Sequence, residues 1–254
     1  MRNVVRRGIA VLSCALLLGF LVWGIRAMPP YGTYAGPYGN LINARAPRER
    51  KVPNAVSAVN FDYRGVDTLG EEFILFAAVA GIVMVLRYDR ERTTHDPLPS
   101  APGRPRVERS EAVRAFSVVG VALTFAFGIY LAIHPHLTPG GGFQGAAIAA
   151  GAFPLVLLGL SYETFSRVTR HKQHEIAEAI GAGAYALIGL ATLAAGGSFL
   201  ANVLPLGTEG SFFSGGTITL INAFVAVEVC AGLTLMFLEF SHETRVQKPK
   251  EPNA

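Results

Sequence analysis

The sequence predicts an all-α, polytopic membrane protein with about six transmembrane helices and both termini in the cytoplasm. Of its 254 residues, 51% are hydrophobic and only 16% are charged. The apolar residues form runs of roughly 17–25 residues, the length that a helix needs to cross a bilayer. The charged residues gather between these runs, whereas a soluble protein disperses them over its surface.

Taken in chain order, the apolar runs cover residues 8–26, 70–87, 113–133, 145–161, 176–195 and 217–239. Residues 1–27 also fit a signal peptide, because a basic start precedes the apolar core. That core, residues 8–25, is longer than the roughly 7–15 residues usual for a signal peptide. We therefore favour a retained first helix and keep the cleaved form as the alternative.

The distribution of basic residues predicts the topology. Lys and Arg lie before the first run, after the second, between the fourth and fifth and after the last, and the gaps 134–144 and 196–216 contain neither. The positive-inside rule then places both termini in the cytoplasm. The long gap 27–69 also holds basic residues, but long loops obey the rule weakly. Because the charges follow the membrane topology, the net charge of +4 does not indicate a nucleic-acid partner.

The stretch 88–112 has the composition of a linker: it is basic and Pro-rich and shows no hydrophobic periodicity. It divides the chain into a two-helix module at 1–87 and a four-helix module at 113–254. Cys14 and Cys230 lie in separate apolar runs and form no C-x-x-C pair. We therefore expect no metal site and no cofactor.

A Pro- and Gly-dense break in the segment 134–151, HPHLTPGGGFQGAAIAAG, separates the third and fourth runs. Irregular backbone near membrane depth is tolerated only against protein or a wet cavity, because lipid cannot hydrogen-bond it. No Lys or Arg is nearby, which excludes a P-loop, and His134 and His136 lack the other ligands of a metal site. We expect a helix that opens at residues 142–145, whose free N–H groups attract anions or order water in a wet region near the outer face.

Glu228 lies near the middle of the sixth run, where neither a cap nor the helix dipole accounts for it. Ionisable groups inside spans are costly and face the bundle interior or a wet cavity. Its neighbours on the same helix face are apolar or small, so any partner must come from another helix, and Ala231 and Gly232 allow a close approach. Glu228 is a candidate for an ion path, with a single interhelical hydrogen bond as the structural alternative.

Four polar residues, His171, Glu178, Tyr185 and Thr192, recur every seven positions and form one slowly drifting stripe on a helix. Such a stripe can relay protons. Glu178 also lies near the start of the fifth run, where a carboxylate complements the helix dipole. Both interpretations remain open.

Glu71 and Glu72 open the second run after the sequence NFDYRGVDTLG. In that sequence Arg64 lies between Asp62 and Asp67, an arrangement that is also typical of an ion-paired turn. The dipole explanation applies to the two glutamates as well. Composition alone favours these structural roles.

Two long motifs resemble a known family. HPHLTPGGGFQGAAIAAGAF at 134–153 resembles the signature of the B-type subunits of the Mrp/Mnh-type multisubunit cation/proton antiporters, in a four-helix module matching about 113–240. PNAVSAVNFDYRGVDTLGEEFILFAAVAGIVMVLR at 53–87 resembles the C-terminal part of the large A-type subunits of the same system. Both modules also occur in membrane-bound hydrogenases related to respiratory complex I. The two motifs thus resemble two different subunits of that system, whereas this chain joins both modules in one polypeptide.

The resemblance implies roles for residues of both motifs. In the motif at 53–87 it makes Glu71 the intramembrane acid, while Glu72 adds a second acid where an apolar residue is expected, so the working acid stays open. Glu178 matches an acidic position early in the helix after the motif at 134–153. The core of that motif consists of Thr138, Pro139, Gly140, Gly141, Gly142, Phe143, Gln144 and Gly145.

The resemblance implies an accessory protein of a bacterial or archaeal cell membrane, whose partners are other membrane subunits, lipid, Na⁺ and H⁺. We expect no catalytic residue and no enzyme activity in this chain. A redox-driven, complex I-like assembly or hydrogenase and a non-conducting scaffold are the alternatives. The candidates for a cation or proton path are Glu71, Glu72, Glu178, Glu228, Tyr185, Thr192 and His171.

Overall fold

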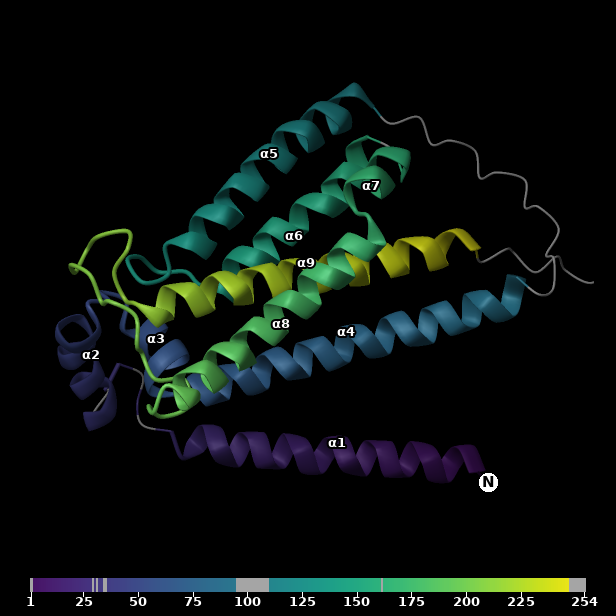
Figure 1. Ribbon diagram of the computed structural model, residues 1–254. Coiled ribbons are helices and arrows are strands. Elements are labelled where there is room, and N and C mark those ends of the chain that lie inside the picture. The colour runs from purple at the N-terminus through teal and green to yellow at the C-terminus, as the bar shows by residue number, and fades with distance from the viewer. Residues whose placement is uncertain are drawn as a thin grey trace, which may run out of the picture. The chain divides into compact units, whose positions relative to one another are not determined.

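The computed structural model describes residues 2–28, 30, 32–33, 36–94, 110–160 and 162–246. In these residues every regular element is a helix, which confirms the all-α prediction (Figure 1). Six of the helices are long and apolar enough to cross a membrane, and each overlaps one of the predicted apolar runs. The cytoplasmic location of both termini stays a prediction.

The chain forms two compact units, Met1–Leu41 and Ile42–Ala254. The first contains helix α1 (Arg2–Arg26), whose apolar part corresponds to the first predicted span. Helix α2 (Pro37–Arg50) begins in the first unit and continues into the second. The composition of residues 28–53 did not predict α2, because the segment is rich in Pro and Gly and has no apolar periodicity.

The second unit is a bundle of five long helices, with α9 in contact with each of the other four. They are α4 (Gly65–Thr94), α5 (Glu111–Ile133), α6 (Gly142–Gly159), α8 (His171–Ala194) and α9 (Thr217–Val246). Helix α9 packs against all four others, α5 packs along α6, and the short α7 (Tyr162–Val168) follows α6 (Figure 1). Because α4 packs on α8 and α9, residues of both predicted modules share one compact unit. Residues 95–109 of the predicted linker lie outside the described residues.

Two helices begin earlier than hydropathy predicts. Helix α4 begins at Gly65 instead of residue 70, and α8 at His171 instead of residue 176. Their first turns, GVDTL and HKQHE, are helical but polar. A hydropathy pattern detects apolar length, so it misses polar helical turns at the ends of spans.

Glycines permit the closest helix packing in the bundle. A Cβ atom placed on Gly128 of α5 would lie 2.5 Å from the amide nitrogen of Ala149, and one on Gly145 of α6 would lie 2.5 Å from the carbonyl oxygen of Gly128. Such distances are far below van der Waals contact, so only glycine fits at either position. Small residues are the usual means by which membrane helices approach each other closely.

Short elements close one end of the bundle, which we call the loop end. Helix α3 (Ala55–Ala58) runs into a π-helical turn (Val59–Tyr63), and α4 follows directly. The break at 134–141 and the loop 195–216 lie at this same end (Figure 1). The opposite end, where Arg87 and His171 lie, we call the Arg87 end.

Candidate functional site

Three carboxyl groups from three helices lie inside the bundle, with Glu228 near each of the other two. They belong to Glu72 of α4, Glu178 of α8 and Glu228 of α9, and we call them the acid cluster. Glu72 and Glu228 are fully buried, and Glu178 is 5% exposed. Glu72 and Glu178 each lie close enough to Glu228 for their charges to interact.

Two glycines bring the acid cluster together. A Cβ atom on Gly181 of α8 would lie 2.6 Å from the Cβ of Glu228, so the two helices touch at this level. A Cβ atom on Gly232 of α9 would lie 3.0 Å from Oε1 of Glu178 and 3.2 Å from a methyl group of Val79 in α4. The predicted close approach at Gly232 is thus present, and it is where the Glu178 side chain lies.

The acid cluster has unused hydrogen-bonding capacity. Apart from the Glu72–Glu228 pair itself, the described residues offer no hydrogen-bond partner to the carboxyl oxygens of Glu72 and Glu228 or to Oε1 of Glu178. Buried polar atoms are normally paired, and buried unpaired carboxyls in a span are costly. No group of three or more His, Cys, Asp or Glu side chains in the described part of the chain is arranged to hold a metal ion. Carboxyl groups can take up and release protons, which is the chemistry open to these side chains.

Polar side chains extend from the acid cluster toward the loop end. Tyr185 and Thr68 are buried beside each other, one on α8 and one on α4. The Tyr185 hydroxyl donates a hydrogen bond to the carbonyl oxygen of Gly65 at 2.8 Å. Leu200, whose backbone has a left-handed φ of 61°, packs against Gly65.

The predicted α8 stripe faces the bundle interior. Glu178, Tyr185 and Thr192 are all buried, and the Thr192 hydroxyl donates to the carbonyl oxygen of Gly189 at 2.9 Å. His171 is partly buried at the Arg87 end. The residues of the stripe therefore lie where a relay needs them, and their role in transfer stays a prediction.

The two adjacent acids of α4 have different environments. Glu72 is buried against α9, whereas Glu71 is exposed on the outer surface of the bundle. Neighbouring residues of a helix point about 100° apart, so only one of them can face the interior. In this chain the interior acid is Glu72, although the resemblance of the motif points to Glu71.

The motif ahead of α4 separates into two ion pairs. Arg64 pairs with Asp67 on the surface, with Nε 2.6 Å from Oδ2, as expected for an ion-paired turn. Asp62 pairs instead with Arg50 of α2, 2.8 Å from its Nε, and accepts a hydrogen bond of 3.0 Å from Asn202 Nδ2. Asp62 thus ties the π-helical turn to α2 and to the loop 195–216.

Tyr63 adds a second link between the same elements. Its hydroxyl donates to Oε2 of Glu49 at 2.8 Å, and the Arg50 guanidinium lies 5.2 Å from its ring centroid. Burial, together with the hydrogen bond to Glu49, raises the pKa of Tyr63 to about 12. The phenol therefore remains a neutral donor over the physiological pH range.

Asn222 of α9 satisfies the backbone at the Gly-rich break. Its Nδ2 donates to the carbonyl oxygen of Ala132 at 2.5 Å, and its Oδ1 accepts from the amide of Gly142 at 2.6 Å. The amide of Gly145 donates to the carbonyl oxygen of Gly141 at 2.9 Å. The expectation of free N–H groups open to anions or water is therefore wrong at both positions, because a side chain and the helix itself take them.

Other protein groups hold the rest of the break. The Pro135 carbonyl oxygen accepts from Asn54 Nδ2 at 2.7 Å and from the Ser57 hydroxyl at 2.6 Å. Nε2 of the buried His136 lies 2.9 Å from the carbonyl oxygen of Phe212, and burial lowers the His136 pKa. The break is thus packed against protein, and no wet region is needed to explain it. Of its motif, Gly141, Gly142 and Gly145 are buried, Pro139 and Gln144 are exposed, and Thr138, Gly140 and Phe143 are partly buried.

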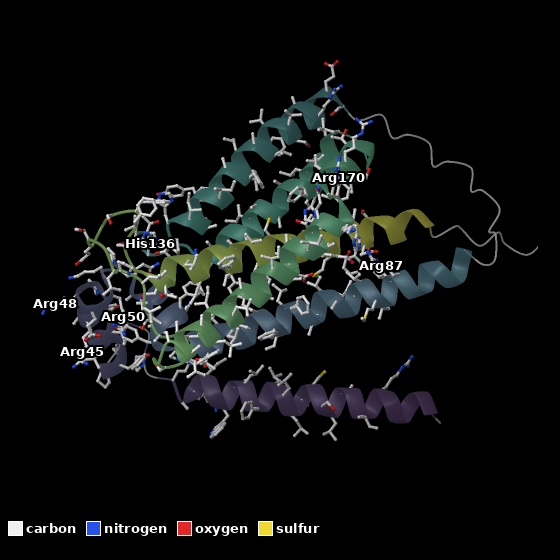
Figure 2. All side chains as sticks on the ribbon, viewed as in Figure 1. Arg45, Arg48, Arg50, Arg87, His136 and Arg170 are labelled. Carbon is white, nitrogen blue, oxygen red and sulfur yellow. The ribbon has the colours of Figure 1, made fainter. Side chains whose placement is uncertain are left out.

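Sequence reasoning missed a charged cluster at the Arg87 end. It consists of Arg87 of α4, His171 and Glu175 of α8, and Glu239 of α9, and we call it the Arg87 cluster. Figure 2 shows Arg87 at the end of the bundle opposite to His136. Glu239 is buried, and the sequence contains a pattern that could have predicted this. Glu239 follows Glu228 by eleven residues, a spacing that returns to the same helix face after three turns.

Comparison with known proteins finds a matching family model and a related protein. Residues 112–235 match the family model described as a domain related to the MnhB subunit of Na⁺/H⁺ antiporter. An uncharacterized protein of Methanocaldococcus jannaschii is 32% identical over 212 residues, which make up 78% of this chain and 80% of that protein.

Two solved structures contain similar chains. One is the membrane-bound sulfane sulfur reductase, an archaeal respiratory membrane complex, with a chain that is 30% identical at a TM-score of 0.69; the match covers 93% of this chain and 98% of that one. The other is the Mrp complex from Dietzia sp. DQ12-45-1b, at 20% identity and a TM-score of 0.70. That match covers 96% of this chain but 27% of the longer one, and at this identity it supports the fold alone.

Proposed function

The chain belongs to the family of membrane proteins that carry the domain related to the MnhB subunit of Na⁺/H⁺ antiporters, and we propose that it forms part of a proton path in an Mrp-type membrane complex. The observation that carries this proposal is the acid cluster, in which Glu72, Glu178 and Glu228 are buried together. Its partners are other membrane subunits of a prokaryotic complex, in which Na⁺ moves in exchange for H⁺.

The geometry supports a path that runs along α8 between the two ends of the bundle. Tyr185 is seven residues from Glu178 and lies toward the loop end, which corresponds to about 10 Å along a helix. Glu72 and Glu228 extend the acid cluster sideways onto α4 and α9. A proton crossing the bundle therefore meets hydroxyl and carboxyl groups from three different helices. Intramembrane ionisable groups mark ion and proton paths by default.

The test is to replace Glu72, Glu178 and Glu228 one at a time by glutamine in the intact complex. Each variant is reconstituted in proteoliposomes, and proton and Na⁺ movement are measured after assembly has been checked by co-purification. Glutamine has nearly the same shape but cannot exchange a proton, so we expect loss of transport with assembly retained. Normal transport in all three variants would leave a scaffold as the role of this chain.

Glu71→Gln is the matched control, because Glu71 is adjacent to Glu72 in sequence but exposed. We expect Glu71→Gln to transport normally where Glu72→Gln does not. The reverse result would assign the working acid to Glu71, as the resemblance of the motif implies, and would remove Glu72 from the path.

A redox-driven complex is the second candidate for the assembly that contains this chain. It is favoured by the match to the archaeal respiratory complex, which extends over nearly the whole of both chains and so includes both modules in one polypeptide. Purification in mild detergent and identification of the accompanying proteins decide between the two. Proteins that hold redox centres would favour the redox-driven complex, and their absence the antiporter.

A further inference from the structure

The Arg87 cluster joins three helices through one imidazole ring. His171 Nε2 lies 2.6 Å from Oε1 of Glu239, and Nδ1 lies 3.4 Å from Oε2 of Glu175. Arg87 Nη2 approaches the same ring, 2.6 Å from Nδ1 and 2.7 Å from Nε2. Arg87 also pairs with Glu175 at 3.0 Å through Nη1 and with Glu239 at 3.7 Å through Nε.

The carboxylate contacts distinguish the two ring nitrogens of His171. A carboxylate only accepts hydrogen bonds, so the short contact with Glu239 places a hydrogen of His171 on Nε2. Arg87 Nη2 is nearly equidistant from both ring nitrogens, so the guanidinium lies against the ring and singles out neither of them. With Nε2 bonded to Glu239, Nδ1 is the ring nitrogen that is left to exchange a proton.

A proton on Nδ1 of His171 needs an acceptor. It cannot be Arg87, which offers none. The acceptor within reach is Oε2 of Glu175, at 3.4 Å. A proton that binds to Nδ1 therefore lies next to Glu175.

Glu175 connects this exchange to the acid cluster. It lies four residues after His171 and three before Glu178, so all three residues share one face of α8. The charge of Glu175 also acts on Glu178, as expected for neighbouring side chains. The side chains of His171 and Glu175 are 23% and 39% exposed at the first turns of α8, where a candidate span begins, so we expect water to reach both.

We propose that His171 is the proton-exchange residue at the Arg87 end of the path, and that Glu175 passes the proton on to Glu178. A proton from water binds to Nδ1 of His171, moves to Oε2 of Glu175 and leaves the imidazole neutral with its hydrogen on Nε2, so the residue is ready for the next proton. Glu239 and Arg87 are positioning residues that hold the ring. This inference rests on the proposed proton path through the acid cluster.

The described charged groups around the ring come from all three helices that pack there: Arg87 from α4, Glu175 from α8 and Glu239 from α9. His174 of α8 is a titratable neighbour that lies apart from this set. Its Nδ1 lies 3.0 Å from the carbonyl oxygen of Arg170, and its ring packs edge-on against Phe153 of α6. His174 therefore provides a matched histidine outside the Arg87 cluster.

The experiment compares His171→Gln with His174→Gln in the reconstituted complex, with the pH varied separately on each side of the membrane. We expect His171→Gln to slow proton movement by about 10²-fold, the lower end of what a positioned proton-transfer group contributes. We also expect His171→Gln to remove the dependence of the transport rate on the pH at the side of the membrane that the Arg87 end faces. His174→Gln should keep both the rate and its dependence on pH. The positive-inside rule predicts that this side is the cytoplasm.

Imidazole added to the buffer separates a transfer role from a structural one. It can replace the missing ring as a proton carrier, so it should restore transport in His171→Gln but not in Glu175→Gln, where the block lies beyond His171. If His171→Gln does not assemble, His171→Asn takes its place. Full rate and unchanged pH response in His171→Gln, while Glu228→Gln abolishes transport, would overturn this inference and leave the path itself intact. Normal transport in Glu228→Gln would instead overturn the proposed path.

Discussion

Replacing Gly181 by alanine adds a methyl group where α8 and α9 touch beside Glu228. The new Cβ atom would lie 2.6 Å from the Cβ of Glu228, 2.7 Å from its amide nitrogen and 2.8 Å from the carbonyl oxygen of Phe224. Carbon atoms in contact are about 3.5–4.0 Å apart, so the helices must separate locally by roughly 1 Å. No side-chain rotation relieves the overlap, because these atoms are backbone or Cβ.

The separation costs stability and moves two members of the acid cluster apart. Overpacking a well-packed core typically costs about 1–3 kcal/mol. For a chain of this size, each kcal/mol lowers Tm by roughly 2–4 °C. We therefore expect Gly181→Ala to lower the Tm of the purified complex by roughly 2–12 °C. Thermal unfolding in mild detergent, followed by circular dichroism, measures this, and the proteoliposome assay measures the accompanying loss of transport.

Gly183→Ala is the control for this prediction. Gly183 lies two residues further along α8, and a Cβ atom placed there would have no other atom within 4 Å. Alanine is the better helix former by about 1 kcal/mol, so Gly183→Ala should keep or raise Tm. Equal Tm values for the two variants would refute the close approach of α8 and α9 at Glu228.

Three further predictions concern the loop end and the α5–α6 contact. Asn222→Ala leaves two buried backbone groups without their partner, at about 1–3 kcal/mol each, so Tm should fall and amide exchange at the break should accelerate in deuterium-exchange mass spectrometry. Gly145→Ala should lower Tm or prevent assembly, whereas Gly151→Ala, at an open position of the same helix, should be tolerated; equal behaviour would contradict the α5–α6 packing. Burial lowers the pKa of His136, so the stability from its neutral form is present above the ordinary value of 6.5 and is lost as pH falls below it. As pH falls below about 6.5, Tm should therefore decrease more steeply in the wild-type complex than in His136→Gln.

Hydropathy was enough to predict the spans, because the length of an apolar run is a local property of the sequence. The α8 stripe was also predictable, since the seven-residue spacing of Glu178, Tyr185 and Thr192 fixes a shared face before any neighbour is known. That this face is buried is consistent with the cost of exposing such groups to lipid.

Contacts between distant residues were not predictable in the same way. The choice of Glu72 over Glu71 as the interior acid depends on how α4 is rotated against α9, and no local pattern specifies that rotation. The role of Asn222 was missed for a related reason: its two partners lie 80 and 90 residues away in sequence. Arg87 ends the second apolar run, where a basic residue is expected from the topology alone, yet it also forms ion pairs between helices.

Asn222 also fixes the axial register of α9. Its two hydrogen bonds attach this helix to the end of α5 and the start of α6, at a point about 9 Å along the helix from Glu228. A rigid helix transmits displacement along its axis, so any sliding of α9 that follows a change of charge at Glu228 must stretch these two bonds. The two bonds thereby resist sliding of α9 and favour a constant depth of Glu228 relative to the end of α5 and the start of α6.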